Sequence, residues 1–499
     1  MKNIFKKSGI GGFLVIAFVM ITSNCTNLTN GLSTDPVNVT DPSVIDASKY
    51  MTGVEVTLMG VFEGDQARQL SMWADNFSGE DRQYAGLGNY VTSGQDFDGE
   101  WVTIYTGIFT NTKLLKQNAR PAKNFISVGI AEVIEGMCIG LAADIWGDVP
   151  FSQITQYPTI VNPTVDNQAS VYAAAQNLLD SAIIHLGQSG NAPGDFLLGG
   201  DKDAWTAVAH TIKARLFLHT RDYANANKHA LVGIVSPSGN VLAPHGSAYL
   251  QTFNLYYSFC TYDRSGYMGA NTFAPRLLDK TQANNRNNAK TDETARLNYL
   301  YTPGGGLNFL PAGSIPYEPN VQCNFDGWGN PVDQDGFFGG VTPFPIVTYQ
   351  ENQLILAESY AKSGDPTNAL ISLNALRAYY ATGAHVNSGY LPMGNNYAAY
   401  VATDFASGGI ENADNIAQDQ ALLREILEER YVTLIGQIEG WNDMRRTGNF
   451  LKLPLPSGKA DYPRRGLYSQ IEINTNPNIA KASQDVTLYT SVNSFSTPY

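Results

Sequence analysis

Apolar residues recur at spacings of three and four along several segments of the chain, which is the pattern of helices that bury one face. In residues 126–145, for example, Ile130, Ile134 and Cys138 follow this period, and a glycine and a proline soon afterwards end it. The same period covers five further segments: 170–186, 203–218, 223–235, 348–362 and 367–380. The pattern therefore predicts a mainly α-helical protein.

Two of the predicted helices form a recognisable pair. Residues 348–362 and 367–380 are joined by the turn Gly364-Asp365-Pro366, and together they have the length and pattern of a tetratricopeptide repeat, about 34 residues. Residues 132–186 and 203–235 look like more degenerate copies of the same hairpin. One hairpin cannot bury its apolar face alone, so we expect these units to stack into a tetratricopeptide-like scaffold of helix pairs.

Two long stretches, 73–100 and 250–347, lack a helical period and are rich in glycine and aromatic residues. That aromatic content argues against disorder, so we expect an ordered, loop-rich subregion laid on the helices. Function concentrates in such loops. They supply our candidate ligand-contacting residues, although packing within the loops explains any single one more simply: Trp73, Asn76, Arg82, Tyr84, Tyr262, Arg264, Tyr267, Asn271 and Trp328.

The N-terminus has the pattern of a secretory signal. Early lysines precede an apolar run over 9–21 and a small polar exit, which is too short and wrongly flanked for a membrane span. The lone Cys25 at the exit indicates lipoprotein processing, with Cys25 as the acylated first residue. Asn24 stands where a small residue is expected, so ordinary cleavage nearby and an uncleaved anchor stay open as alternatives.

The residues after Cys25 have the composition of a flexible tether, rich in Asn, Thr, Asp and Pro up to about residue 43. Such a tether would hold a folded body near a membrane while acyl chains anchor it. We therefore expect a signal peptide over 1–24, a lipid-anchored tether over 25–43, and a single helical domain over 44–499 with the two loop-rich insertions.

Charge and composition narrow the classes of partner. The chain has a net charge of −13, and removal of residues 1–24, which carry three lysines and no acidic residue, moves it to −16. An acidic exported chain is a poor candidate for binding nucleic acid, which needs a basic face. No later run of apolar residues approaches the length of a membrane helix. The 27 Tyr, 22 Phe and 6 Trp are partly core, and the remainder suit stacking against sugar rings.

The sequence carries no signature of a metal, cofactor or nucleophile site. It has no Cys/His metal spacing and none of the nucleophile-elbow, P-loop, Rossmann or zincin motifs. Paired acids for glycoside hydrolysis are set by spatial rather than sequential spacing, and nothing points to a particular pair. Cys138 is expected to be a small buried hydrophobe. For Cys260 and Cys323 the sequence leaves open whether they form a disulfide.

The most informative string is 428–448, where a helix with Glu428, Glu429 and Arg430 runs into a cluster of acidic, basic and indole side chains. Arginine pairs bidentately with carboxylates and stacks on aromatic rings, so such groups can be buried together. A catalytic carboxylate pair is the competing interpretation. We favour a buried structural brace that closes the helical body, made of Arg430, Glu439, Trp441, Asp443, Arg445 and Arg446.

Several strings, taken in order, resemble the SusD/RagB family of outer-membrane nutrient-binding lipoproteins. They are Leu141-Ala-Ala-Asp-Ile-Trp-Gly-Asp-Val-Pro150, Lys213-Ala-Arg215, Thr342-Pro-Phe-Pro-Ile-Val-Thr348, Glu439-Gly-Trp-Asn-Asp-Met-Arg-Arg-Thr-Gly448 and Tyr462-Pro-Arg-Arg465. The likeness extends over nearly the whole mature chain. No single string decides it, but their order and spacing together are fairly specific.

The resemblance implies a mostly helical lipoprotein of the outer membrane, facing the cell exterior, that is not an enzyme and uses no cofactor. Such a protein captures oligosaccharides for import and delivers them to a partner TonB-dependent (SusC-like) transporter. Capture of peptides on the same architecture is the alternative, and a glycoside hydrolase is a more distant one. The family's ligand site is not marked by a fixed string, so the resemblance adds no binding residue to those taken from the loops.

Overall fold

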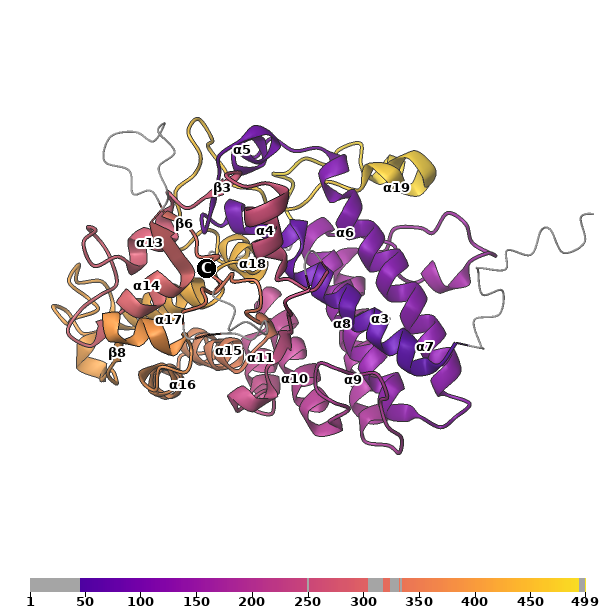
Figure 1. Ribbon diagram of the computed structural model, residues 1–499, viewed down its shortest axis with the longest axis horizontal. Helices are drawn as coiled ribbons and strands as arrows, with labels where there is room; N and C mark the ends of the chain where they lie inside the picture. The colour runs from indigo at the N-terminus through magenta and orange to yellow at the C-terminus, as the bar shows by residue number, and fades with distance from the viewer. Residues whose placement is uncertain (1–44, 249–250, 304–316, 324–331, 333, 493–498) are drawn as a thin grey trace, which may run out of the picture. The chain divides into compact units, whose positions relative to one another are not determined.

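Helices make up most of the folded body of the protein (Figure 1). The computed structural model describes residues 45–248, 251–303, 317–323, 332, 334–492 and 499. The chain divides into two units, Met1–Asp46 and Ala47–Tyr499, and the account below concerns the second. The expected signal peptide, the whole of the expected tether with Cys25, and Trp328 lie outside the described residues.

Three helix pairs form the scaffold, as the apolar period predicts. Helix α8 (Phe125–Trp146) packs along α9 (Gln168–Leu186), α10 (Lys202–His219) along α11 (Tyr223–Ala230), and α15 (Tyr349–Lys362) along α16 (Pro366–Ala381). Contacts of α10 with α9 and of α11 with α15 join the pairs into a stack. The predicted tetratricopeptide-like, mainly α-helical fold is therefore confirmed.

Glycines on α8 explain why its neighbours pack so closely. A Cβ atom at Gly129 or Gly136 would lie 2.7 or 2.9 Å from a leucine Cγ of α9, and one at Gly140 would lie 2.7 Å from Leu216 of α10. Distances below 3 Å are not tolerated between real side chains. The three positions lie seven and four residues apart, on one helical face, so the backbone of α8 can approach both neighbours.

The expectation that no later segment reaches membrane-helix length is wrong for α8. Among the described residues this helix, 22 residues long with a mean hydropathy of 1.8 over its most apolar window, is long and apolar enough to cross a membrane, yet 94% of that window is buried inside the protein. A central helix covered on all sides is apolar all round for the same reason as a membrane span. Here α8 is the core helix of the scaffold.

The end of α11 also differs from the prediction, at Ala230 instead of residue 235. Asn352 of α15 donates from Nδ2 to the carbonyl oxygens of Ala230 and Ile234, at 2.9 and 3.1 Å. A tertiary contact therefore replaces the last helical hydrogen bonds, which the apolar period alone does not reveal.

The two loop-rich stretches are ordered where described and contain short elements. The first holds β1 (Ser78–Gly79), α5 (Arg82–Gly88) and η2 (Gly94–Phe97). The second holds α12 (Leu255–Ser258), η6 (Phe259–Asp263), β3 (Met268–Gly269), α13 (Phe273–Leu278), α14 (Thr294–Leu300), β5 (Tyr301–Pro303), β6 (Tyr317–Pro319) and β7 (Phe344–Val347). Strands β1 and β3 pair antiparallel, with Ser78 opposite Gly269. This pairing brings the two stretches together.

The remaining elements complete the body. The helices are α3 (Ala47–Glu63), α4 (Asp65–Trp73), α6 (Asp98–Val102), η3 (Thr103–Thr110), α7 (Asn111–Ala119), η4 (Ile154–Gln156), η5 (Pro237–Gly239), η7 (Ser388–Met393), η8 (Ala402–Asp404), α17 (Gln418–Thr433), α18 (Glu439–Arg446), α19 (Gln470–Thr475) and α20 (Pro477–Ala482). The strands are β2 (Val241–Ala243), which pairs with β7, and β4 (Thr291–Asp292), which pairs with β8 (Asn396–Tyr397); β5 pairs with β6.

Tryptophan side chains mark the core. Of the six in the sequence, the five that the structure describes are at most 4% exposed: Trp73, Trp101, Trp146, Trp205 and Trp441. Trp73 packs between Tyr90, Phe97 and Trp441, with ring centroids 6.1–6.3 Å away. The described tryptophans therefore stabilise the core and do not form a surface for stacking on sugars.

Candidate functional site

Two of the candidate ligand residues from the sequence are buried, and their assignment needs correction. Trp73 is 1% exposed and donates from Nε1 to the carbonyl oxygen of Leu87, at 3.0 Å. Asn76 is fully buried beneath the turn at Gly436. Both lie in the core because α4 and the residues after it pack against α18, so neither side chain is available to a ligand in this structure.

The other described candidates lie nearer the surface but do not form one group. Arg82, Tyr262 and Arg264 are exposed, Tyr267 and Asn271 are partly buried, and Tyr84 is 6% exposed. The Arg264 guanidinium lies 5.9 Å from the Tyr267 ring centroid, and Asn271 accepts a hydrogen bond from Arg276. Of the whole set, Tyr84 and Arg264 share a cleft, and Asn271 lines a separate hollow.

This cleft, about 530 Å³ in volume, is bounded by α4, α5, η2, α6 and η6. Its floor is organised by Arg68 of α4, which donates to the Tyr84 hydroxyl at 3.3 Å and pairs with Asp65. The guanidinium lies 4.5 Å from the Phe259 ring centroid, and the Tyr84 and Phe259 rings are 4.6 Å apart. One arginine thus joins the neighbouring helices α4 and α5 to η6, which lies about 190 residues further along the chain.

Three buried polar groups on this floor lack a hydrogen-bond partner among the described residues. They are Oε1 of Gln66, Nε2 of Gln69 and Oε1 of Glu100, on side chains that are 2%, 3% and 8% exposed. Buried polar atoms are nearly always paired, and leaving one unpaired costs about 1–3 kcal/mol. Burial also raises the pKa of the Glu100 carboxyl well above its usual range, which favours the protonated form, and in that form the carboxyl can donate a hydrogen bond.

Sequence reasoning missed Gln66, Gln69 and Glu100, although one signal was present. Within a helix over 65–73, the positions of Gln66, Gln69 and Trp73 fall three and four residues apart, on one face. Two amides on the same face as a buried indole break the amphipathic pattern. Such polar residues at core positions mark either a satisfied network or a ligand site.

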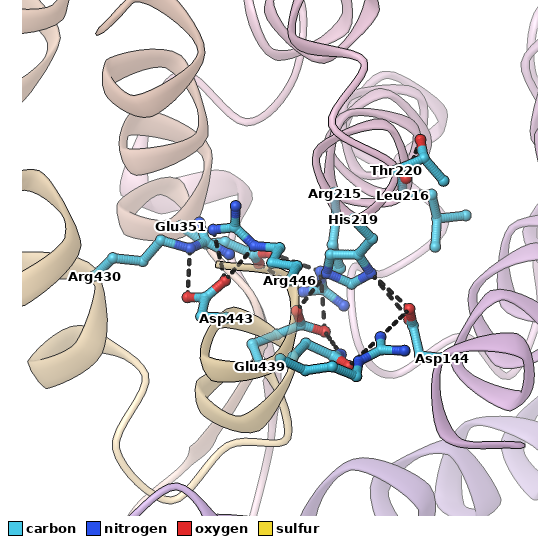
Figure 2. Close-up of polar contacts among 12 residues, drawn as sticks. Asp144, Arg215, Leu216, His219, Thr220, Glu351, Arg430, Glu439, Asp443 and Arg446 are labelled. Atoms are coloured by element: carbon cyan, nitrogen blue, oxygen red, sulfur yellow. Dashed lines mark hydrogen bonds and ion pairs between the residues drawn. The ribbon is translucent and has the colours of Figure 1, made fainter. Parts of the chain in front are cut away.

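The brace residues of the sequence form a buried ionic cluster at the junction of α17 and α18 (Figure 2). Both terminal nitrogens of Arg446 donate to the Glu358 carboxylate, and its Nε donates to Asp443 at 2.8 Å. Arg430 donates to the other Asp443 oxygen at 2.6 Å. Arg430 and Arg446 are at most 1% exposed.

The cluster continues into the helix pairs through His219 of α10. Its ring nitrogens lie 3.0 Å from the Asp144 carboxylate of α8 and 2.8 Å from Glu439 of α18 (Figure 2). Arg215 binds Glu351 of α15 with two contacts of 2.6 Å. The cluster therefore links α8, α10, α15, α17 and α18.

Arg445 and Trp441 close the same cluster. Arg445 donates to Asp144 at 3.1 Å, and its guanidinium lies 4.9 Å from the Trp441 ring centroid. Although burial opposes it, the charges of His219 and Arg215 lower the pKa of Glu439 below its usual range. With every carboxylate paired and enclosed, the geometry favours the structural brace over a catalytic carboxylate pair.

Glu429 belongs to a different ionic cluster from its neighbour Arg430. Its carboxylate accepts from Arg286 at 2.7 Å and from Arg296 at 2.8 Å. Arg286 also pairs with Glu293 and Glu425. Helix α17 is therefore held by ion pairs on two sides, because Glu429 belongs to one ionic cluster and Arg430 to the other.

Comparison with known proteins identifies the family of the chain. A family model for SusD-like proteins, described as starch-binding and associating with the outer membrane, matches residues 39–293. The chain belongs to this SusD-like family. No curated protein matches it.

Solved structures share the fold over almost their whole length. A SusD/RagB family protein from Bacteroides thetaiotaomicron is 19% identical, with a TM-score of 0.64 over 91% of this chain and 98% of its own. A SusD homologue from Parabacteroides distasonis is 16% identical, with a TM-score of 0.66 over 93% and 99% of the two chains. A chitin-binding protein is 21% identical, with a TM-score of 0.59 over 88% and 96%.

Membership sets the general class of this SusD-like protein. The family is one of outer-membrane-associated proteins that bind glycans rather than of enzymes. In the described part of the chain no group of three or more His, Cys, Asp or Glu side chains could hold a metal ion, and Cys260 and Cys323 are both free.

Proposed function

We propose that this SusD-like protein is a lipoprotein of the cell surface that captures oligosaccharides in the cleft beside α4 and delivers them to a partner TonB-dependent transporter. The observation that carries the proposal is the set of unpaired polar groups on the cleft floor, at Gln66, Gln69 and Glu100. Sugar hydroxyls both donate and accept hydrogen bonds, so one ligand can satisfy an amide oxygen, an amide nitrogen and a carboxyl together.

The size and lining of the cleft suit a glycan. Its volume of about 530 Å³ lies within the usual range for small-molecule sites. Gln83 and Gln95 add further amides at the rim. Because Tyr84 and Phe259 are at most 6% exposed, hydrogen bonds rather than ring stacking supply most of the proposed affinity.

Two of the carboxylates that line the cleft are held by contacts within the protein. Asp65 is paired with Arg68. Asp96 accepts from the backbone nitrogen of Ser93 at 2.7 Å and from the Thr92 hydroxyl at 2.8 Å, and so caps η2. A glycoside hydrolase needs two carboxyl groups free to act on one bond. Of the four carboxyl groups that line the cleft, Asp65 and Asp96 are engaged in these contacts and Glu100 and Asp263 remain, so a turnover assay separates binding from hydrolysis.

Replacing Gln69 by leucine is expected to weaken glycan binding by roughly ten-fold, because the ligand loses a hydrogen bond in a buried position. Isothermal titration with a panel of neutral oligosaccharides measures the effect, and thermal unfolding shows that the variant is folded. Gln188→Leu, on an exposed turn after α9, is the matched control and should bind like the parent.

Other outcomes of the same titration would reject the proposal. Equal affinity of Gln69→Leu and the parent would remove the cleft as the binding site. Turnover of any oligosaccharide in the panel would favour the glycoside hydrolase, and retention of peptides with no glycan bound would favour the peptide-binding alternative.

The proposed anchoring of residues 1–43 has its own test. Mass spectrometry of the mature protein from membranes is expected to show a chain that begins at an acylated Cys25, and Cys25→Ala should release the protein from the membrane fraction. Protease treatment of intact cells should then digest the folded unit 44–499 if it faces outward. An unmodified N-terminus at another residue would contradict the lipid anchor.

A further inference from the structure

A second hollow, about 260 Å³ in volume, lies on the other side of α5 from the cleft. Leu87 lines the cleft, and the next residue, Gly88, lines the hollow. On α4, Gln69 likewise faces the cleft while Met72 faces the hollow. Different residues of α5 line the two depressions, so this helix forms a ridge between them, and Trp73 of α4 donates to the carbonyl oxygen of Leu87.

The backbone is strained on the side of the hollow. Asp75 and Tyr90, which both line it, have φ angles of 55° and 60°, a left-handed conformation that is uncommon for residues other than glycine and genuinely unfavourable for a bulky one. The Tyr90 ring packs edge-on against Trp73 at 6.2 Å, which holds it there. Residues kept in such conformations cluster at ligand sites.

The hollow also offers polar groups of the kind found in the cleft. Asp75 accepts from the backbone nitrogen of Phe273 at 2.8 Å, and burial raises the pKa of its carboxyl to about 7 although Arg276 opposes the shift. Asn271 lies on the same wall, where its side-chain oxygen accepts from Arg276 at 2.7 Å.

The charges of the two depressions are nearly balanced. In the cleft the carboxylates of Asp65, Asp96 and Asp263 stand against the guanidiniums of Arg68 and Arg264, and burial raises the pKa of Glu100, which favours its uncharged form. In the hollow the single guanidinium, Arg276, faces the Asp75 carboxyl. No excess of positive charge attracts an acidic glycan, and the chain as a whole carries −13, which repels one.

We infer that an uncharged oligosaccharide crosses the ridge formed by α5 and occupies the cleft and the hollow together. The inference rests on the proposed function and extends it to ligand length and charge. A helix with its side chains is about 10–12 Å across, so a ligand must be several sugar rings long to reach both sides. Affinity should then rise with chain length until both depressions are filled.

The test is a titration of the full-length protein with malto-, cello- and chito-oligosaccharides of two to eight units, and with oligogalacturonates as the acidic counterpart. In the series that binds, the longer members are expected to bind more tightly. Asn271→Leu should weaken the long members by roughly five-fold and leave the shortest ones unchanged. Asn162→Leu, an exposed position in the loop before α9, is the matched control.

The outcomes separate the inference from the proposed function. Equal affinity for short and long ligands would overturn the inference that the ligand crosses α5, and so would an equal loss of affinity for both in Asn271→Leu. Tighter binding of oligogalacturonates than of the neutral series would overturn the inference that the ligand is uncharged. If the parent protein bound none of these glycans, the proposed function itself would be rejected. Asp75→Asn, which keeps the acceptor for Phe273 in a residue that tolerates left-handed backbone, should also reduce affinity only for long ligands.

Discussion

Replacing Arg446 by alanine is expected to lower the free energy of unfolding by about 3–5 kcal/mol, enough to leave little folded protein. The guanidinium is 1% exposed and pairs with Glu358 and Asp443. Its removal leaves the buried carboxylates of Glu358 and Asp443 short of one counter-charge, with Arg430 alone to balance both, which is much more costly than loss of the contact itself. Urea unfolding followed by circular dichroism measures the change.

Arg424→Ala provides the control on the same helix as Arg430. Arg424 pairs with Asp414 at 2.7 Å, but both side chains are partly exposed, so the loss should stay below about 1 kcal/mol. Arg445→Ala should also unfold rather than selectively lose ligand. A stable Arg446→Ala or Arg445→Ala protein that no longer bound glycans would show that the ionic cluster takes part in binding.

The stability of the protein should fall by roughly 3 kcal/mol between about pH 6.5 and pH 9 because of His219. Burial opposes protonation, but the charges of Asp144 and Glu439 outweigh it and raise the pKa of His219 to about 9. The folded state therefore binds a proton that the unfolded chain releases near pH 6.5. This stabilisation is complete below that pH and is lost as the pH rises through the folded pKa. Unfolding free energies measured at pH 6 to 10 test it.

Glu55 also makes the protein less stable as the pH rises, so its effect has to be separated from that of His219. Burial beside Asp195 raises the pKa of Glu55 to about 9, so its contribution also declines as the pH rises through this value. In Glu55→Gln the pH dependence that remains should contain that of His219 together with those of Asp75 and Glu428, whose pKa values burial raises to about 7, so the comparison with His219→Gln isolates the imidazole. In His219→Gln the decline assigned to the imidazole should disappear and the protein should be less stable at pH 6.5. An unchanged pH profile in His219→Gln would refute the assignment.

The scaffold was predictable because helix pairs are local. The turn at Gly364–Pro366 and the apolar period on either side of it are contained in one short stretch, so the sequence specifies the α15–α16 pair by itself. The end of α11 was not predictable, because Asn352 of α15 determines it.

The cleft was beyond sequence reasoning for a related reason. Pairing of β1 with β3 brings together residues about 190 positions apart, and no local pattern encodes that approach. Aromatic composition suggested a stacking surface, yet the described tryptophans fill the core. The polar residues that matter, Gln66 and Gln69, lie on a helix that the apolar period did not reveal.

The ionic contacts of the string 428–448 extend further than the sequence indicated. Consecutive helical residues point about 100° apart, so Glu429 and Arg430 enter different clusters. The partners of the brace, Asp144, His219, Arg215 and Glu351, come from three other helices. Only the fold could identify them as partners, although Asp144 and Arg215 lie within the strings that carry the family resemblance.

One nine-residue helix, α4, serves two purposes, and this limits how the protein can diversify. Gln66 and Gln69 form the cleft floor, while Trp73 packs on Trp441 beside the ionic cluster. Substitutions on α4 that change ligand preference therefore also disturb packing, and marginal stability tolerates few of them. New specificities should arise more readily at the rim, from Gln83 on α5 or Arg264 after η6, where a side chain can be exchanged without repacking the interior.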